Sequence, residues 1–455
     1  VGMGTGTWTA LSGPAGIGKT RVLHEGLRLG PESGISCVLI SLSEDLAGQP
    51  HSGISRLLNE VRSRQPTAFE SLIDGADEAR QWFFRAHIPE VEVSGEELVT
   101  PPPVALRETL LQCFRSLSDG QKWLFLIDDV AHLDPHSSEL LRVVIEEEKL
   151  PVAVVSAHRN EELEADVVPT PGISFLQSLD RLPWFDQRSL LPLSKESVEL
   201  LIAVLLPNHH APSEFSDLVF DLTAGNPLFV EEVLRIAIAS QRITRRGGEW
   251  FVQPLDRNDL PTTLQEAIAR RIALLDDEIG QDIARASAIG TTLTPDLLQA
   301  LLGKNEGEIL DFVDKVRDLG FVEGGQQGDL NEIRFSSSVV RDQAYQQMDP
   351  VERTRTHREI GKIEEYRAGS LVGALASRLA YHFERGEVHE KARSYLQAAQ
   401  GSALPAIVAG EWAEAEIPMH RRRRITEAAV PLPDEGWPSL DDALRALAQA
   451  TKSLW

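Results

Sequence analysis

The chain of 455 residues is too long for a single hydrophobic core, so about three or four domains are expected. Its formal net charge of −24 at pH 7 would repel phosphate backbones, which argues against nucleic acid as a partner. No apolar run approaches the roughly 18 residues that a membrane-spanning helix needs, so no membrane contact is expected.

Residues 7–190 alternate short apolar runs with helical patterns, which is typical of a parallel sheet with helices on both faces. Strands are expected at the apolar runs Thr7–Leu11, Ile35–Leu42, Trp123–Ile127 and Val152–Val155. The last three are nearly continuous apolar runs, as strands buried on both faces must be. This pattern predicts an α/β core domain over residues 1–193.

The rest of the chain is mainly helical. Residues 194–257 are predicted to form a helical lid domain, opened by a helix that Ser194 caps. Residues 258–349 combine amphipathic helices with a hairpin between Phe321 and Phe335, which predicts a winged-helix domain. Residues 350–455 predict an α-helical region of tetratricopeptide-like repeats, with one helix pair turning at Gly386.

One segment fits the phosphate-loop pattern G-x-x-x-x-G-K-[ST] without deviation. It consists of Gly13, Pro14, Ala15, Gly16, Ile17, Gly18, Lys19 and Thr20. The glycines let backbone amides curl around an anion, Lys19 reaches the β- and γ-phosphates, and the Thr20 hydroxyl binds magnesium. The segment lies between an apolar strand and an amphipathic helix, so the core is predicted to be a P-loop domain that binds a magnesium nucleotide.

Two strand ends supply the other candidate residues. The strand at 123–127 delivers Asp128, predicted to hold magnesium, and Asp129, predicted to orient or deprotonate the attacking water. The alternative for this pair is a helix-capping loop. The strand at 152–155 leads to Arg159, a candidate sensor of the γ-phosphate. Its alternative is a surface ion pair with Glu161 or Glu162.

Together these motifs resemble the STAND class of P-loop ATPases over about residues 7–400. The likeness is strongest to bacterial regulators whose ATPase modules accompany LuxR-type DNA-binding, adenylate-cyclase or protein-kinase domains. The segments that carry it are SGPAGIGKTRVLHE, DDVAHLDPHSSELL, SAHRNEEL and TAGNPLFVEEVL. The resemblance implies that Pro227 packs near the base. It also implies that Ser337 lies near the ADP β-phosphate, where the family usually has a histidine.

The resemblance implies a molecular switch with ATP or ADP and Mg²⁺ as cofactors. A closed ADP form opens when ATP and an inducer bind, and the open form often becomes a homo-oligomer. The inducer or protein partner would bind the C-terminal helical region, and ATPase activity would be slow. The chain is expected to be part of a larger regulator.

Two other functions remain open at this stage: a DNA loader of the AAA+ type, and a nucleotide-binding scaffold without hydrolysis. Asp129 is the residue that separates the switch from the scaffold. The two cysteines, Cys37 and Cys113, lie in apolar segments and favour a reducing, cytoplasmic location.

Overall fold

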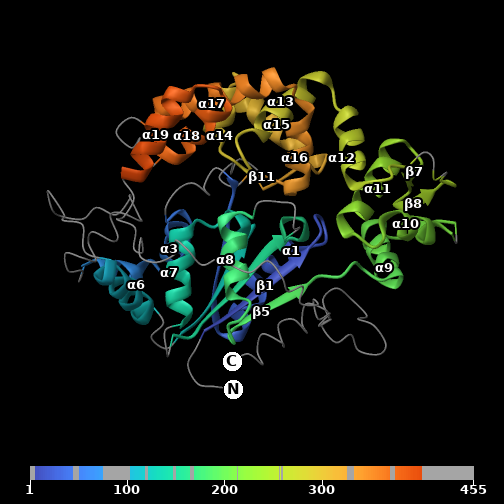
Figure 1. The fold of residues 1–455 in the computed structure, drawn as a ribbon. Helices are drawn as coiled ribbons and strands as arrows, with labels where there is room; N and C mark the ends of the chain where they lie inside the picture. The colour runs from blue at the N-terminus through green and yellow to red at the C-terminus, as the bar shows by residue number, and fades with distance from the viewer. Residues whose placement is uncertain are drawn as a thin grey trace, which may run out of the picture. The chain divides into compact units, whose positions relative to one another are not determined.

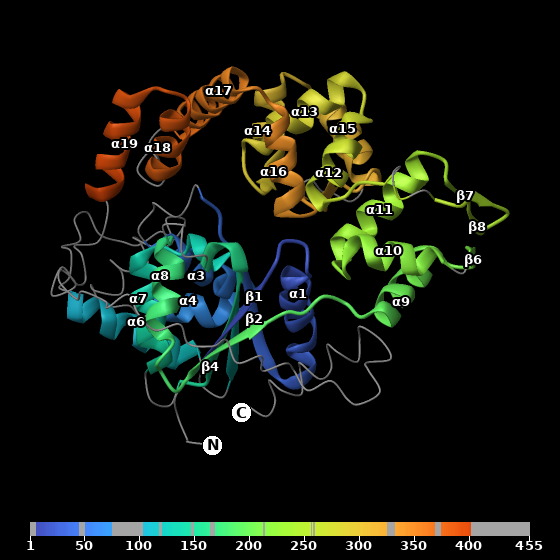
Figure 2. The same cartoon turned by 45° about the vertical axis from the view of Figure 1, so that its right-hand side comes forward.

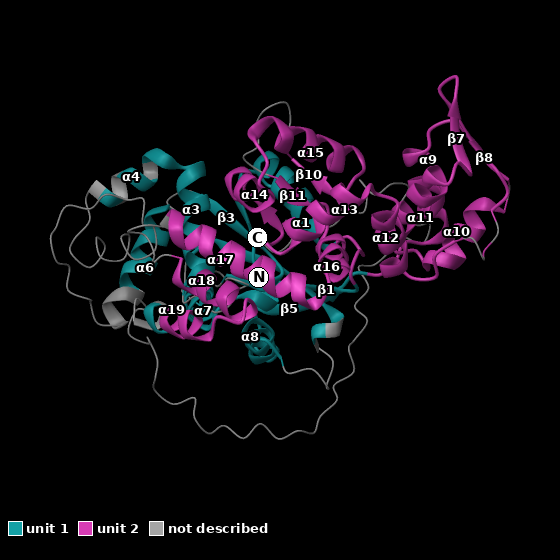
Figure 3. Cartoon of the chain, turned by 90° about the horizontal axis from the view of Figure 1, so that it is seen from above, with its two compact units in different colours: residues 1–14, 19–190, 397–455 teal, residues 15–18, 191–396 magenta. Residues whose placement is uncertain are grey.

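The computed structural model describes residues 6–44, 51–74, 103–117, 121–146, 150–163, 169–212, 214–255, 257, 260–324, 333–368 and 375–401. The chain divides into two compact units (Figure 3). The first unit comprises residues 1–14, 19–190 and 397–455, and the second comprises residues 15–18 and 191–396. Residues 402–455 of the predicted repeat region lie outside the described residues. The predicted domain boundaries remain predictions.

The described part of the first unit contains a five-stranded sheet in the order β2-β3-β4-β1-β5, in which all neighbouring strands are parallel (Figure 1). Its strands are β1 (Thr7–Gly13), β2 (Ile35–Ser41), β3 (Lys122–Asp128), β4 (Val152–Arg159) and β5 (Phe185–Ser189). The predicted α/β fold class and the four predicted strands are therefore confirmed. The fifth strand was not predicted, because it is an edge strand of sequence FDQRS whose side chains are exposed or half-buried.

Helices cover both faces of this sheet (Figures 1 and 2). On one face, Leu23 of α1 packs with apolar side chains of β1 to β4, such as Leu124. On the other face, a larger core joins Trp8 and Phe125 to the remaining helices. These elements are α1 (Lys19–Leu29), α3 (Ser52–Arg64), α4 (Pro66–Asp74), α6 (Pro103–Leu117), α7 (Pro135–Glu146) and α8 (Pro171–Leu179), with the short helices η1 (Pro31–Ser33), η2 (Val130–His132) and η3 (Asn160–Leu163).

The buried carboxylate of Asp134 joins two of these helices. It accepts hydrogen bonds from the backbone amides of His51 (2.8 Å) and Gly53 (3.2 Å) at the start of α3. It also accepts from the amide of Ser137 (2.9 Å) in the first turn of α7. The first amides of a helix have no partner within the helix, so one side chain satisfies both helix starts. Asp134 therefore has a structural role beside the predicted magnesium-binding strand end.

The second unit is mainly helical. Its helices are α9 (Lys195–Leu205), α10 (Phe215–Thr223), α11 (Pro227–Ala239), α12 (Leu264–Ala273), α13 (Asp277–Ser287), α14 (Pro295–Leu302), α15 (Glu306–Asp318), α16 (Ser338–Gln347), α17 (Pro350–Ala368), α18 (Ala376–Arg385) and α19 (His389–Gly401), the last of which continues past residue 396. A continuous hydrophobic core contains residues from Val198 in α9 to Ile360 in α17.

Within its described residues this unit also contains two small sheets, in the orders β6-β8-β7 and β10-β11-β9. Their strands are β6 (His209–His210), β7 (Ile243–Arg246), β8 (Glu249–Val252), β9 (Thr292–Leu293), β10 (Val322–Glu323) and β11 (Ile333–Phe335). The predicted hairpin is present as the antiparallel pair β10–β11, although most of its turn lies outside the described residues. The β7–β8 hairpin was not predicted, because its strands are short and largely exposed, and β7 ends in Arg245 and Arg246.

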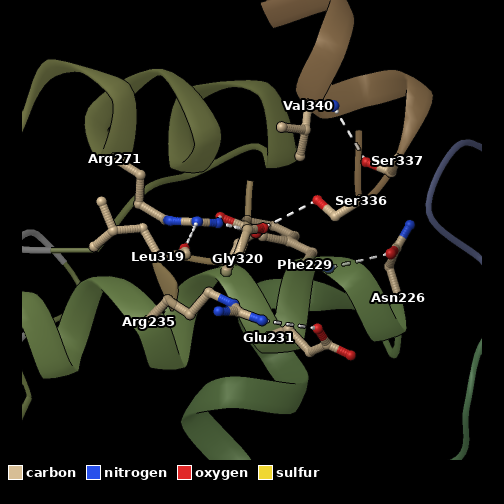
Figure 4. A network of polar contacts seen from close by, with 11 residues as sticks. Asn226, Phe229, Glu231, Arg235, Arg271, Leu319, Gly320, Ser336, Ser337 and Val340 are labelled. Atoms are coloured by element: carbon tan, nitrogen blue, oxygen red, sulfur yellow. Dashed lines mark hydrogen bonds and ion pairs between the residues drawn. The ribbon is translucent and has the colours of Figure 1, made fainter. Parts of the chain in front are cut away.

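Two features stabilise the second unit. Arg271 of α12 forms a buried ion pair with Glu232 of α11 and lies over the Phe321 ring. It also donates to the Leu319 carbonyl at 2.5 Å (Figure 4). The predicted turn at Gly386 joins α18 to α19. A Cβ atom there would lie 2.9 Å from the Cα atom of Arg358, so α17 packs too closely for a larger residue.

Among the described residues, no helix has the length and apolar composition needed to cross a bilayer.

Candidate functional site

The ends of the predicted phosphate loop are held by Lys19, the first residue of α1. Its ammonium donates to the carbonyl of Gly13 at 2.7 Å and to that of Pro14 at 3.0 Å. Lys19 is buried, so its charge lies within the loop rather than in bulk solvent. Gly16 and Gly18 have φ angles of +79° and +105°, which side chains strongly disfavour. At Gly16 and Gly18 the loop therefore adopts left-handed or otherwise strained backbone conformations that glycine tolerates and other residues do not.

Thr20 and Asp128, the predicted magnesium ligands, are brought together by the fold. The Thr20 hydroxyl donates to Asp128 Oδ2 at 2.8 Å, although the two residues are 108 positions apart. Burial and the negative charge of Asp129 raise the pKa of Asp128 to about 6, and the Thr20 hydrogen bond and Lys19 oppose that shift. A buried carboxylate with a raised pKa gains from a nearby cation, so this pair fits a magnesium ion.

No group of three or more His, Cys, Asp or Glu side chains in the described ranges is placed to hold a metal ion. A magnesium ion at Thr20 and Asp128 would thus need oxygen ligands from water and from nucleotide phosphates. Mg²⁺ is commonly bound in this way, by one or two protein ligands together with phosphate oxygens.

Asp129 follows β3 in a left-handed conformation, with a φ angle of 52°. Its backbone amide donates to Asp128 Oδ1 at 3.1 Å, which fixes the orientation of that carboxylate. Positive φ values are rare for residues other than glycine, although aspartate tolerates them better than most. The predicted catalytic role of Asp129 stays a prediction.

Arg159 ends β4 and pairs in register with Gly13, the first residue of the loop. Its backbone amide donates to the Glu162 carboxylate at 3.0 Å. Burial raises the pKa of Glu162 and the negative charge of Asp129 adds to the shift, while the amide bond and charge of Arg159 oppose it. The charges of Arg159 and Asp129 therefore both act on the Glu162 carboxylate, in opposite directions. The predicted sensor role of Arg159 stays a prediction.

His158 is a site residue that the sequence did not reveal. It is buried beside Ser12, its register partner on β1, and neither ring nitrogen has a hydrogen-bond partner among the described residues. Burial, assisted by the charge of Lys19, lowers its pKa to about 4, so the ring is neutral at pH 7. The only sequence signal was a polar residue continuing an apolar strand, which does not distinguish a core histidine from a functional one.

Pro227 and Ser337 both lie at helix starts in the second unit. Figure 4 shows Ser337 and also Asn226, which precedes Pro227. Pro227 is the first residue of α11, capped by Asn226, whose Oδ1 accepts from the Phe229 amide at 3.2 Å. Ser337 caps α16, and its Oγ accepts from the Val340 amide at 3.2 Å. A hydroxyl that accepts one bond still has a hydrogen to donate. The nucleotide contacts of Pro227 and Ser337 stay predictions.

Asn226 itself was not singled out by sequence. Its Nδ2 donates to the Ala15 carbonyl at 2.9 Å, and the Leu228 amide donates to the Gly16 carbonyl at 3.3 Å. These contacts lie within the second unit, which includes residues 15–18. The start of α11 therefore binds the middle of the phosphate loop.

Comparison with known families agrees with this geometry. Residues 1–155 match the family model of the AAA ATPase domain. This part of the chain is thus similar to an AAA ATPase domain. The matched residues include the whole loop from Gly13 to Thr20 and both Asp128 and Asp129. The predicted resemblance to P-loop ATPases is confirmed.

Known proteins with a similar arrangement are distant. An uncharacterised protein of Rhizobium meliloti is 23% identical over 417 residues, which are 86% of this chain and 38% of that protein. The crystal structure of a STAND protein with a tetratricopeptide repeat sensor from Pyrococcus horikoshii is 14% identical, with a TM-score of 0.45, over 88% of this chain and 55% of that one. The Aeropyrum pernix ORC1 protein in complex with DNA is also 14% identical, with a TM-score of 0.30, over 75% of this chain and 87% of that one.

The chain thus spans little more than a third of the Rhizobium relative and about half of the Pyrococcus one.

Proposed function

We propose that this chain is an ATP- and ADP-binding signalling switch of the STAND class, with slow magnesium-dependent ATPase activity. The observation that carries the proposal is the 2.8 Å contact between the Thr20 hydroxyl and the buried Asp128 carboxylate. This contact joins the phosphate loop to the strand end that would hold magnesium, as nucleotide hydrolysis requires.

Each residue of the first unit has a distinct task in this proposal. Lys19 would exchange its bonds to loop carbonyls for bonds to the β- and γ-phosphates. Thr20 and Asp128 would hold the magnesium ion, whose charge stabilises the phosphate oxygens when it is bound. Asp129 would orient the attacking water, and Arg159 would stabilise charge on the γ-phosphate.

The second unit would supply the switch. Pro227, at the first position of α11, would pack near the base, and Ser337 would donate to the β-phosphate of ADP in the closed form. An inducer or protein partner would bind the helical region after residue 350, and the open ATP form would assemble into a homo-oligomer. The two cysteines are both buried free thiols, which accords with the reducing cytoplasm as the site of action.

The first experiment is to measure the nucleotide content and the magnesium-dependent turnover of the purified chain. Lys19→Ala removes charge-assisted bonds worth roughly 1.5–3 kcal/mol, so ATP affinity should fall about tenfold to a hundredfold in calorimetry. Unchanged affinity would show that Gly13–Thr20 does not bind phosphate, and the proposal would be abandoned.

The two other functions predict different results in the same experiment. A scaffold without hydrolysis would bind MgATP but release no phosphate above the Asp129→Asn background. A DNA loader would shift DNA at sub-micromolar protein in a salt-dependent manner. The net charge of −24 favours the switch over the loader.

A further inference from the structure

Asn226 uses the two ends of its side-chain amide for different contacts. Oδ1 caps α11 by accepting from the Phe229 amide at 3.2 Å. Nδ2 donates to the carbonyl of Ala15 at 2.9 Å, in the phosphate loop. The capping bond is common at helix starts, whereas the second bond joins positions 211 residues apart. The second bond is therefore not explained by helix formation alone.

The next contact comes from the first turn of α11. Pro227 has no backbone N–H, and the Leu228 amide has no partner within the helix because it lies in the first turn. This amide donates to the Gly16 carbonyl at 3.3 Å. Two successive carbonyls of the loop, those of Ala15 and Gly16, are thus bound by the start of α11.

Because the peptide group is planar, these two bonds also determine where the neighbouring N–H groups point. A trans peptide is planar, with its C=O and its N–H on opposite sides. A bond that holds the Ala15 carbonyl toward α11 therefore aims the Gly16 N–H away from α11, and the bond to the Gly16 carbonyl does the same for the Ile17 N–H. Two successive amides directed the same way, with Gly16 at a φ of +79°, form the kind of nest that binds anions.

The fit between the loop and the helix start is close. A Cβ atom at Gly16 would lie 2.8 Å from Leu228 Cβ and 2.9 Å from Asn226 Oδ1. At Gly18, where φ is +105°, a Cβ atom would meet nothing within 4 Å. Gly16 is therefore needed both for its backbone conformation and for its contact with α11, whereas Gly18 is needed for conformation alone.

We propose that Asn226 is a positioning residue for phosphate binding, which holds the Ala15 carbonyl so that the Gly16 amide faces the nucleotide phosphates. The Leu228 amide acts in the same way on the Gly16 carbonyl and so on the Ile17 amide. This inference rests on the proposed function. It assigns to the asparagine of the Gly225-Asn226-Pro227 segment a role toward the phosphates, separate from the role of Pro227 toward the base. Loss of the Asn226 donor would leave the loop intact but less often in its binding conformation.

The test separates the capping bond from the bond to the loop. Asn226→Ser keeps a good helix cap but removes the donor to Ala15. Asn226→Asp keeps the capping oxygen and places a second oxygen against the Ala15 carbonyl. The matched control is Asn305→Ser, because Asn305 caps α15 through the same kind of bond, to the Glu308 amide at 3.1 Å. Lys19→Ala serves as the reference for lost phosphate binding.

The readouts are the MgADP dissociation constant by calorimetry and the melting temperature of each variant without nucleotide. Asn226→Ser should weaken MgADP binding about threefold to tenfold, the effect of one neutral hydrogen bond, and Asn226→Asp should weaken it further. Asn305→Ser should leave the dissociation constant unchanged. The melting temperatures of the two serine variants should shift by similar amounts, and that of Asn226→Asp should shift least.

Wild-type affinity for MgADP in both Asn226 variants would overturn the inference and leave the proposed function standing. A changed melting temperature with unchanged affinity would have the same meaning, since a capping residue alone behaves in that way. A wild-type chain that binds no MgADP would overturn the proposed function and this inference with it. If Asn226→Ser does not fold, Asn226→Asp still decides the question, because it retains the cap.

Discussion

Removal of the Glu232 charge by the substitution Glu232→Gln should strongly destabilise the packing of α11 against α12. The side chains of Glu232 and Arg271 are only 2% and 6% exposed, so the pair is almost completely removed from water. Breaking a buried pair by removing one partner typically costs about 3–5 kcal/mol, because the other charge remains buried without compensation. The remaining bond from Arg271 to the Leu319 carbonyl would not compensate that charge.

The double variant Glu232→Leu with Arg271→Met provides the control. Replacement of both charges by apolar groups of similar volume is often neutral or stabilising. Here it also removes the donor to the Leu319 carbonyl, which should cost about 1–3 kcal/mol if that carbonyl finds no water. The double variant should therefore be less destabilised than Glu232→Gln alone.

Local hydrogen exchange is the suitable assay, because a chain of several domains does not unfold as one two-state unit. Peptides from α11 and α12 should lose protection in Glu232→Gln, while peptides from the sheet of the first unit serve as the internal reference. Equal protection in wild type and Glu232→Gln would refute the reasoning. A double variant less protected than Glu232→Gln would show that the Leu319 and Phe321 contacts outweigh the charge pair.

Four further predictions follow from the described contacts. Asp128→Asn should weaken magnesium-dependent ATP binding, and wild-type affinity for ATP should fall as the pH drops through about 6, where Asp128 becomes neutral. Asp129→Asn should leave ATP binding unchanged but reduce phosphate release. Intact turnover in both variants would contradict the assignment. His158→Phe should raise the melting temperature of the chain without nucleotide, because it replaces two buried ring nitrogens that have no hydrogen-bond partner with carbon. A lower melting temperature would show that the histidine ring is hydrogen-bonded. Ser337→His should strengthen ADP binding relative to ATP binding about fivefold in competition assays. The same ADP-to-ATP preference in the variant and the wild type would place Ser337 away from the nucleotide. Burial and nearby arginines lower the pKa of His357 in α17 to about 3, so the unfolded segment takes up a proton below pH 6.5 and stability falls from there toward pH 3. This dependence is at most about 1.4 kcal/mol per pH unit, and His357→Phe should reduce it in hydrogen exchange of α17 peptides measured at several pH values. An unchanged pH dependence would refute the assignment.

The sequence was sufficient to predict the α/β core, because strands buried on both faces must be apolar along their whole length. The strands around Leu39, Phe125 and Val154 therefore stand out as continuous apolar runs. Strands whose side chains are largely exposed carry no such signal, since solvent accepts polar side chains there. For this reason β5 and the β7–β8 hairpin were not predicted.

The sequence also identified those site residues whose spacing along the chain is set by their chemistry. The phosphate loop must have its glycines, Lys19 and Thr20 within eight positions, because one turn of backbone surrounds one phosphate. Asp128 was found because a carboxylate at the end of a buried strand has few other uses beside such a loop. Constraints between residues that are close along the chain can therefore be recognised from the sequence alone.

Only the tertiary structure revealed the residues that act across large separations. Asn226 and Asp134 stood out in the sequence only as parts of segments that resemble the STAND class. The fold brings Asn226 to the Ala15 carbonyl, and it places Asp134 where it satisfies the first amides of α3 as well as those of α7. His158 was hidden for the same reason, since its burial and its lack of bonding partners depend on which residues surround it in space. Hydrogen bonding and desolvation depend on which atoms are neighbours in space, and no spacing along the chain encodes that.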